Sequence, residues 1–213
     1  MTSEPVTSEP VTSEPVSSDS ADKKKVTIVA IGGSTRPGSS SEMAVRLAGR
    51  AAEAAGAQVI YFTGRDLMLP IYDTESDDRT EQATAVVEAI RGAQGLLIAS
   101  PGYHGGISGM IKNALDYIED LREDDQPYLH GRAVGCIAVA YGWQATVSTL
   151  QQIRQVTHAL RGWPTPLGAT INAQATRFAS DATTDDQSAA QQLQTIGEQV
   201  VEFAQMRGRS APS

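Results

Sequence analysis

The chain has 213 residues, which is enough for one ordinary domain with a substantial core. Hydrophobic residues make up 40% of it and charged residues 20%, and no apolar run approaches the roughly 20 residues of a membrane-spanning helix. A formal net charge of −8 disfavours a nucleic-acid partner. Cys136 is the only cysteine, which excludes an intrachain disulfide and a cysteine-ligated zinc or iron–sulfur site within one chain. We therefore expect a small-molecule ligand.

The first 25 residues are of low complexity. Residues 2–16 are three copies of TSEPV, and a basic run of lysines occupies residues 23–25. Regular proline and glutamate with almost no large apolar side chain predict a disordered tail over residues 1–25. The tail lacks the basic region followed by an apolar stretch that marks a secretory signal, so we expect a cytoplasmic protein.

From residue 26 onward, short apolar runs alternate with helical patterns. The sequence predicts strands over residues 26–31, 58–62, 95–99, 133–140 and 167–171. It predicts helices over residues 41–55, 80–92, 107–122, 145–161 and 186–207. This rhythm indicates an α/β domain over residues 26–208, a flavodoxin-like three-layer αβα sandwich with a five-stranded parallel sheet in the order 2-1-3-4-5. Ligands of such folds bind at the carboxyl ends of the strands.

The turn after the first predicted strand, residues 32–42, is rich in glycine, serine and threonine and contains one arginine. Glycines let the backbone approach a ligand closely, and the first N–H groups of a helix are free donors with a favourable dipole. The arginine adds a permanent positive charge. We therefore predict a phosphate-binding loop with the side-chain donors Ser34, Thr35, Arg36, Ser39, Ser40 and Ser41.

Ser39 and Glu42 also have the spacing of a capping box, in which the serine only begins the helix. Both roles are compatible, because a cap uses one or two backbone donors and leaves the arginine unexplained. The loop is not a P-loop, since Ser39 stands where that motif requires lysine. The dinucleotide pattern G-x-G-x-x-G is absent, and no acidic residue ends the second strand. The terminal phosphate of a mononucleotide such as FMN remains.

The segment after the third predicted strand, residues 100–106, reads Ser-Pro-Gly-Tyr-His-Gly-Gly. Proline and glycine favour a tight turn whose free backbone groups suit a planar heterocycle. The Tyr103 ring is suited to flank such a ligand, although packing within the loop explains Tyr103 and His104 equally well. A hydrolase is disfavoured, because no G-x-S-x-G nucleophile turn accompanies the His-Gly-Gly sequence.

The loop Gly-Ser-Thr-Arg-Pro-Gly-Ser from residue 33 and the run from Ser100 to Tyr117 together resemble the NADPH-dependent FMN reductase family, over about residues 26–172. The resemblance implies FMN phosphate contacts from Ser34, Arg36, Ser39 and Ser41. It implies contacts along the isoalloxazine ring from Pro101, Gly102, Tyr103, His104 and Gly105. The chain departs from the family at three of these positions, where relatives often carry asparagine for Ser41 and His104 and glutamate for Gly102.

The segment after the fourth predicted strand, residues 140–144, stands where similar proteins have a glycine-rich turn near the flavin. We therefore add Gly142 and Trp143 to the expected cofactor contacts, although packing against a helix or a second subunit explains Trp143 equally well. The helix signature shared with the family also includes three polar residues for which a solvated or interface face is the simpler interpretation, Lys112, Asn113 and Asp116.

The resemblance implies hydride transfer from NADPH or NADH to FMN, and then to free flavin, a quinone or another small acceptor. The cofactor carries this chemistry, so we predict neither a catalytic side chain nor a metal site. Similar proteins commonly form dimers or tetramers, which implies a homodimer or homotetramer. The alternatives are a flavodoxin-type electron carrier and a non-catalytic flavin-binding interaction protein.

Overall fold

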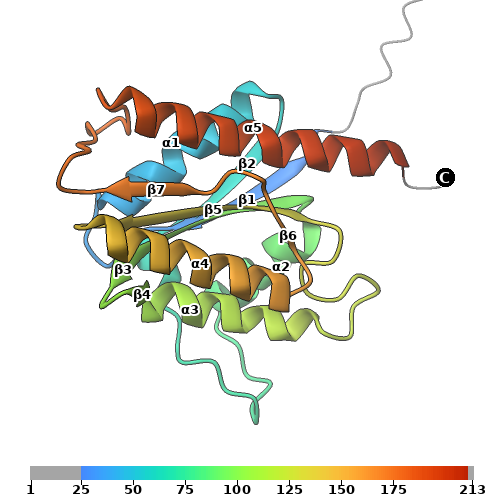
Figure 1. Ribbon diagram of the computed structural model, residues 1–213. Helices are drawn as coiled ribbons and strands as arrows, with labels where there is room; N and C mark the ends of the chain where they lie inside the picture. The colour runs from blue at the N-terminus through green and yellow to red at the C-terminus, as the bar shows by residue number, and fades with distance from the viewer. Residues whose placement is uncertain (1–24, 211–213) are drawn as a thin grey trace, which may run out of the picture.

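The computed structural model describes residues 25–210, so the predicted tail, apart from Lys25, lies outside the described residues (Figure 1). The strands are β1 (Thr27–Gly32), β2 (Gln58–Thr63), β3 (Gly95–Tyr103), β4 (Gly106–Ile107), β5 (Ala133–Ala140), β6 (Trp163–Pro164) and β7 (Ala169–Asn172). The helices are α1 (Ser40–Ala54), α2 (Glu81–Gly92), α3 (Gly109–Asp116), α4 (Trp143–Ala159) and α5 (Gln187–Ser210), with 3₁₀ turns η1 (Gly64–Leu67) and η2 (Tyr117–Leu121). Over residues 25–210, no helix has the length and apolar content to cross a membrane.

The parallel strands stand in the order β2-β1-β3-β5, and β6 and β7 share the next position beside β5. This arrangement confirms the predicted order 2-1-3-4-5. The predicted fifth strand is split, however, because β6 pairs with the start of β5 and β7 with its end. Pro164 ends β6 and Pro166 lies within the break, and neither has the N–H group that a continuous ladder needs. With β4, the described part of the sheet has seven strands rather than five.

Side chains of β1 alternate between the two faces of the sheet. Ile28 and Ala30 pack in the core beneath α1 and α5, whereas Val29 and Ile31 pack in the core beneath α2 and α3. Figure 1 shows the sheet between these helix layers, with α3 and α4 on the face opposite α5. Each fully buried aliphatic side chain contributes about 1.5–3 kcal/mol, so both layers stabilise the sheet. Cys136 lies in the second core, where burial raises the pKa of its thiol to about 11.

The third strand is longer than predicted. β3 continues past Ala99 to Tyr103, and it pairs with β5 as far as Pro101, which lies opposite Val139. β1 ends opposite Ala99 and β4 pairs only from Gly102, so Pro101 has a strand edge on the side that faces β1. A proline is tolerated on a strand edge, because its missing N–H breaks no ladder bond there. The predicted loop over residues 100–106 is therefore mostly a β-hairpin.

A two-residue turn of His104 and Gly105 joins β3 to β4. Their φ angles are 53° and 81°, in the left-handed region that the tightest hairpin turns require. The helix predicted from residue 107 begins later, because Ile107 belongs to β4 and Ser108 caps α3. The Ser108 hydroxyl accepts a hydrogen bond from the Ile111 N–H at 3.3 Å. The predicted helix also tightens into η2 after residue 116, yet Ile111, Leu115 and Ile118 along it are all buried.

Candidate functional site

The loops after the first and third strands meet at the carboxyl-terminal edge of the sheet. They border a pocket of about 230 Å³. Its lining comprises Ser34, Thr35, Arg36, Ser39, Ser40, Ser41, Pro101, Gly102, Tyr103, Val139, Ala140, Tyr141 and Ala173. All the predicted donors of the first loop therefore lie around one cavity with the end of β3. The adjacency follows from the sheet, because β1 and β3 are paired neighbours that point the same way.

Two glycines set the path of the loop between β1 and α1. Gly33 has a φ of 111° and Gly38 a φ of 66°, both in the region that favours glycine. A Cβ atom at Gly33 would lie 3.0 Å from the backbone nitrogen of Gly64. Glycine at this position thus lets the loop pass close to η1 and brings the following serines to the pocket.

Ser39 caps α1, as its spacing from Glu42 predicts. Its Oγ accepts a hydrogen bond from the Glu42 N–H at 3.3 Å. The Glu42 carboxylate does not complete the usual box, because it accepts the Gly38 N–H at 3.0 Å and pairs with Arg46 at 2.9 Å. The Arg46 guanidinium therefore neutralises the Glu42 carboxylate, which holds this loop through the Gly38 N–H.

Several donors of the loop remain free for a ligand. The Arg36 guanidinium is exposed and has no carboxylate partner within residues 25–210, while its backbone N–H donates to Ser34 Oγ at 3.2 Å. Ser40 and Ser41 lie in the first turn of α1, where backbone N–H groups have no intrahelical acceptor. A guanidinium, several hydroxyls and first-turn N–H groups suit a dianionic phosphate monoester. The donor set thus fits the phosphate of FMN.

A buried serine fixes the end of β3 where it enters the pocket. Ser100 is 0% exposed, and its hydroxyl donates to the Pro101 carbonyl at 2.9 Å and accepts the Ser108 N–H at 3.0 Å. Beyond it, the Tyr103 side chain is 55% exposed at the pocket rim. The pocket therefore has a rigid wall of backbone and an aromatic edge, which suits one face of a planar ring.

The third side of the pocket is lined by residues outside the set of predicted cofactor contacts. Gly142 is the N-cap of α4 and Trp143 its first residue, and neither lines the pocket, nor do His104 and Gly105 of the hairpin turn. Residues at the ends of β5 and β7 line it instead, namely Val139, Ala140, Tyr141 and Ala173. For Val139, Ala140 and Ala173 the position at strand ends was the available signal, since small apolar side chains have no chemical signature.

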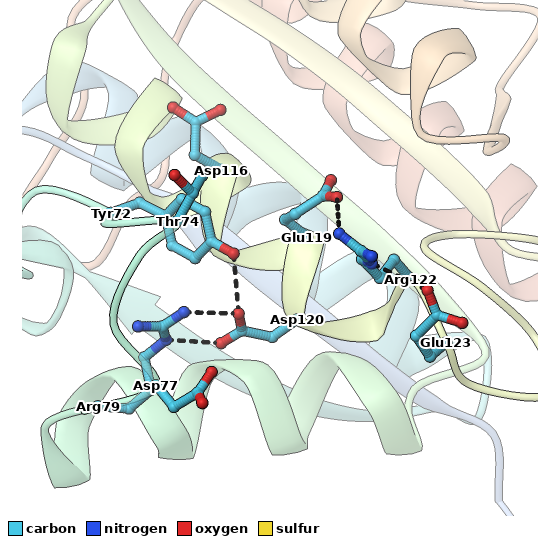
Figure 2. Close-up of a pocket in the computed structure, with 9 residues that line it drawn as sticks. All are labelled: Tyr72, Thr74, Asp77, Arg79, Asp116, Glu119, Asp120, Arg122 and Glu123. Atoms are coloured by element: carbon cyan, nitrogen blue, oxygen red, sulfur yellow. Dashed lines mark hydrogen bonds and ion pairs between the residues drawn. The ribbon is translucent and has the colours of Figure 1, made fainter.

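A larger pocket of about 700 Å³ lies beside η2 (Figure 2). It is lined by Tyr72, Thr74, Asp77, Arg79, Asp116, Glu119, Asp120, Arg122 and Glu123. Arg79 forms two hydrogen bonds with Asp120, at 2.8 and 2.9 Å, and the Tyr72 hydroxyl donates to Asp120 at 3.0 Å. The Arg79 hydrogen bonds lower the pKa of Asp120 below its ordinary value. Because these central groups satisfy one another, we assign them to holding the loop after β2 against η2.

Asn113 has a role that the sequence interpretation missed. It is 9% exposed rather than on a solvated face, and its Oδ1 accepts the Tyr72 N–H at 2.9 Å. Its Nδ2 donates to the Pro70 carbonyl at 2.8 Å. Lys112 and Asp116 do pair with each other on the half-exposed side of α3. Nowhere in residues 25–210 are three His, Cys, Asp or Glu side chains grouped to hold a metal ion.

Two curated relatives match part of this chain. An NADPH azoreductase from Bacillus sp. (strain OY1-2) is 29% identical over 86 residues, which cover 40% of this chain and 45% of that protein. A probable NADPH:quinone oxidoreductase 2 from Oryza sativa subsp. japonica is 32% identical over 140 residues, which cover 64% of this chain and 66% of that protein. The chain thus spans from under half to just under two thirds of these relatives.

A solved structure shares the fold of this chain, and a family profile matches most of its sequence. The flavoenzyme NAD(P)H:(acceptor) oxidoreductase FerB from Paracoccus denitrificans superposes with a TM-score of 0.63 at 22% identity, over 85% of this chain and 99% of that one. This likeness shows the flavodoxin-like α/β fold. Residues 26–176 match the profile of NADPH-dependent FMN reductases, and this stretch includes both pocket loops. The chain therefore belongs to the NADPH-dependent FMN reductase family.

Proposed function

We propose that the protein is an NAD(P)H-dependent FMN reductase. In this proposal the FMN phosphate binds Arg36, the N-terminus of α1 and the loop hydroxyls of Ser34, Thr35, Ser39, Ser40 and Ser41. The flavin ring lies along Pro101, Gly102 and Tyr103. The observation that supports it most is that these two groups of residues line one pocket at the carboxyl edge of a parallel sheet.

The donor set indicates that the cofactor carries the redox chemistry and that the chain binds and orients it. FMN held here would supply the redox chemistry, since its ring can take a hydride from the nicotinamide, two electrons with one proton, and deliver both electrons and the proton to an acceptor. The chain's own residues bind and orient, since the lining offers hydroxyls, one guanidinium and backbone groups. His104, Gly105, Gly142 and Trp143 adjoin the lining residues in sequence, and we assign them contacts with the outer edge of the ring or with the nicotinamide.

The acceptor and the assembly are part of the proposal. The two relatives, an NADPH azoreductase and a probable NADPH:quinone oxidoreductase, favour azo compounds, quinones or free flavin as the acceptor. Tyr141 and Trp143 are 68% and 60% exposed beside the pocket, which favours a homodimer or homotetramer in which a second copy covers them. A cytoplasmic location suits a chain with one cysteine, which needs no oxidising compartment.

Anaerobic reduction tests the activity. The full chain is loaded with FMN, freed of excess flavin and mixed with NADPH or NADH under nitrogen. We expect rapid bleaching of the bound flavin and its return on adding a quinone. Bound flavin that dithionite bleaches but neither nicotinamide bleaches would instead identify an electron carrier. Multi-angle light scattering of the same sample measures the oligomeric state.

A further inference from the structure

Helix α4 lies directly against the β3–β4 hairpin that carries one wall of the pocket. Residues 145, 148, 149 and 152 fall on one face of α4, spaced as i, i+3, i+4 and i+7. A Cβ atom at Gly102 would lie 2.6 Å from Thr149 Oγ1, and one at Gly106 would lie 3.1 Å from Gln152 Oε1. The glycines of the hairpin thus permit a close approach of the helix.

Three hydrogen bonds tie the hairpin to this face of α4. Ser148 Oγ donates to the Gly105 carbonyl at 2.8 Å, and Gln152 Nε2 donates to the same oxygen at 3.2 Å. Gln152 Oε1 accepts the Ile107 N–H at 3.2 Å. A carbonyl oxygen has two acceptor sites, so the hydrogen bonds from Ser148 and Gln152 occupy both sites of the Gly105 oxygen. The Gln152 amide bridges the turn to β4, and this pattern also fixes which way the amide points.

The tip of the hairpin has few other anchors. Tyr103 is 55% exposed, and His104 is exposed at the turn itself. The N–H groups of His104 and Gly105 donate to no backbone carbonyl within residues 25–210. With no buried side chain at the turn, its position depends on the hydrogen bonds from Ser148 and Gln152.

We propose that Ser148 and Gln152 are positioning residues that fix the 103–106 turn and thereby set the affinity for FMN and its reduction potential. This inference rests on the proposed function. His104 and Gly105 lie outside the pocket lining, and the proposed function assigns them contacts with the outer edge of the flavin ring. A turn held in one conformation presents their free N–H groups to that edge without reorganisation, and preorganised donors favour the form of a ligand that carries more negative charge. Releasing the turn therefore weakens binding of reduced FMN more than binding of oxidised FMN, and it lowers the potential.

Substitutions of Gln152 and Ser148, with Gln151 as a control, separate the positioning role from a general effect of changing the surface of α4. Gln152→Leu removes both amide contacts, whereas Gln152→Glu keeps the acceptor for Ile107 and loses the donor to Gly105. Gln151→Leu and Gln151→Glu are the matched controls, because Gln151 is exposed on the same helix. Ser148→Ala removes one donor, and Ser148→Thr retains the hydroxyl. Thermal unfolding of each variant checks that it is folded.

Three measurements then follow. In the FMN-free protein, hydrogen exchange at the Ile107 amide accelerates in Gln152→Leu and not in Gln151→Leu. The FMN dissociation constant rises by about tenfold in Gln152→Leu, the effect of about one hydrogen bond. The substitution weakens the affinity for reduced FMN more than the affinity for oxidised FMN. The midpoint potential falls by about 30 mV for each factor of ten between these two losses of affinity. Gln152→Glu and Ser148→Ala give smaller shifts, and Ser148→Thr stays near the wild type.

The outcomes distinguish the two proposals. A wild-type chain that takes up no FMN would overturn the proposed function and this inference together. FMN uptake by the wild type, with faster Ile107 exchange but an unchanged affinity and potential in Gln152→Leu, would overturn the positioning role alone. An equal shift in the Gln151 controls would also overturn it, because those variants leave the hairpin contacts intact.

Discussion

At the scale of single residues, the proposed phosphate binding depends most on Arg36. It is the cation of the pocket lining and has no carboxylate partner in the described chain. Charge-assisted hydrogen bonds contribute about 1.5–3 kcal/mol, so Arg36→Ala should raise the FMN dissociation constant by about 10- to 100-fold. Isothermal titration of the full chain measures this. Arg122→Ala removes an equal charge from the other pocket and should leave the affinity unchanged.

The charge of Asp120 contributes to stability through its hydrogen bonds with Arg79 and Tyr72. Its hydrogen bonds from Arg79 lower its pKa below the ordinary value of 3.8. A carboxylate with a lowered pKa stabilises the fold above its unfolded-state value, and this contribution is lost as the pH falls through the folded-state value. Asp120→Asn should therefore cost about 2 kcal/mol of unfolding free energy at pH 7, and the difference from wild type should shrink below pH 3.8.

Urea unfolding at several pH values provides this comparison. Asp125→Asn is the control, because Asp125 is exposed on the loop after η2, where such substitutions change stability by under about 0.5 kcal/mol. A difference between wild type and Asp120→Asn that stays constant down to pH 2 would show that the Arg79 pair is not what holds the loop after β2.

At the scale of elements, the contact of α1 with α5 depends on one glycine. A Cβ atom at Gly197 would lie 2.2 Å from the Ala48 carbonyl oxygen, which is backbone and cannot turn aside. Gly197→Ala should therefore separate the two helices and lower the unfolding free energy by about 1–3 kcal/mol. Gly208→Ala, on the same helix with open space around it, should leave stability unchanged or raise it by up to about 1 kcal/mol. Equal effects of the two substitutions on thermal unfolding would contradict this packing.

The sequence predicts elements well where an apolar pattern alone determines them. β1 and β5 are continuous apolar runs, and both appear close to the predicted bounds. The prediction is wrong where pairing overrides local signals: the Ser-Pro-Gly of residues 100–102 reads as a turn, yet β5 and β4 pair with it and extend β3. The hydrogen bonds from Ser148 and Gln152 to the hairpin could not be predicted from the sequence for a related reason. Only the packing of α4 brings these two side chains to the hairpin.

At the scale of the whole molecule, the order of the sheet assembles the pocket. β1, β3 and β5 run parallel and adjacent, so the segments that leave their carboxyl ends meet although they are far apart in the chain. The sequence could therefore predict that the donors of the first loop and the end of β3 lie together, and they line one pocket. It did not predict the contribution of Ala173, which reaches the pocket only because the split fifth strand places β7 beside the end of β5.

The measurement that tests this account most directly compares two flavins on the full wild-type chain. FMN and riboflavin share the ring and differ in the phosphate, so their difference in affinity reports the pocket between β1 and α1. In a fluorescence titration we expect one FMN per chain, and riboflavin binding at least about 100-fold weaker, as the loss of several charge-assisted hydrogen bonds predicts. Equal affinity for the two flavins, or no binding of FMN by the folded chain, would contradict the account.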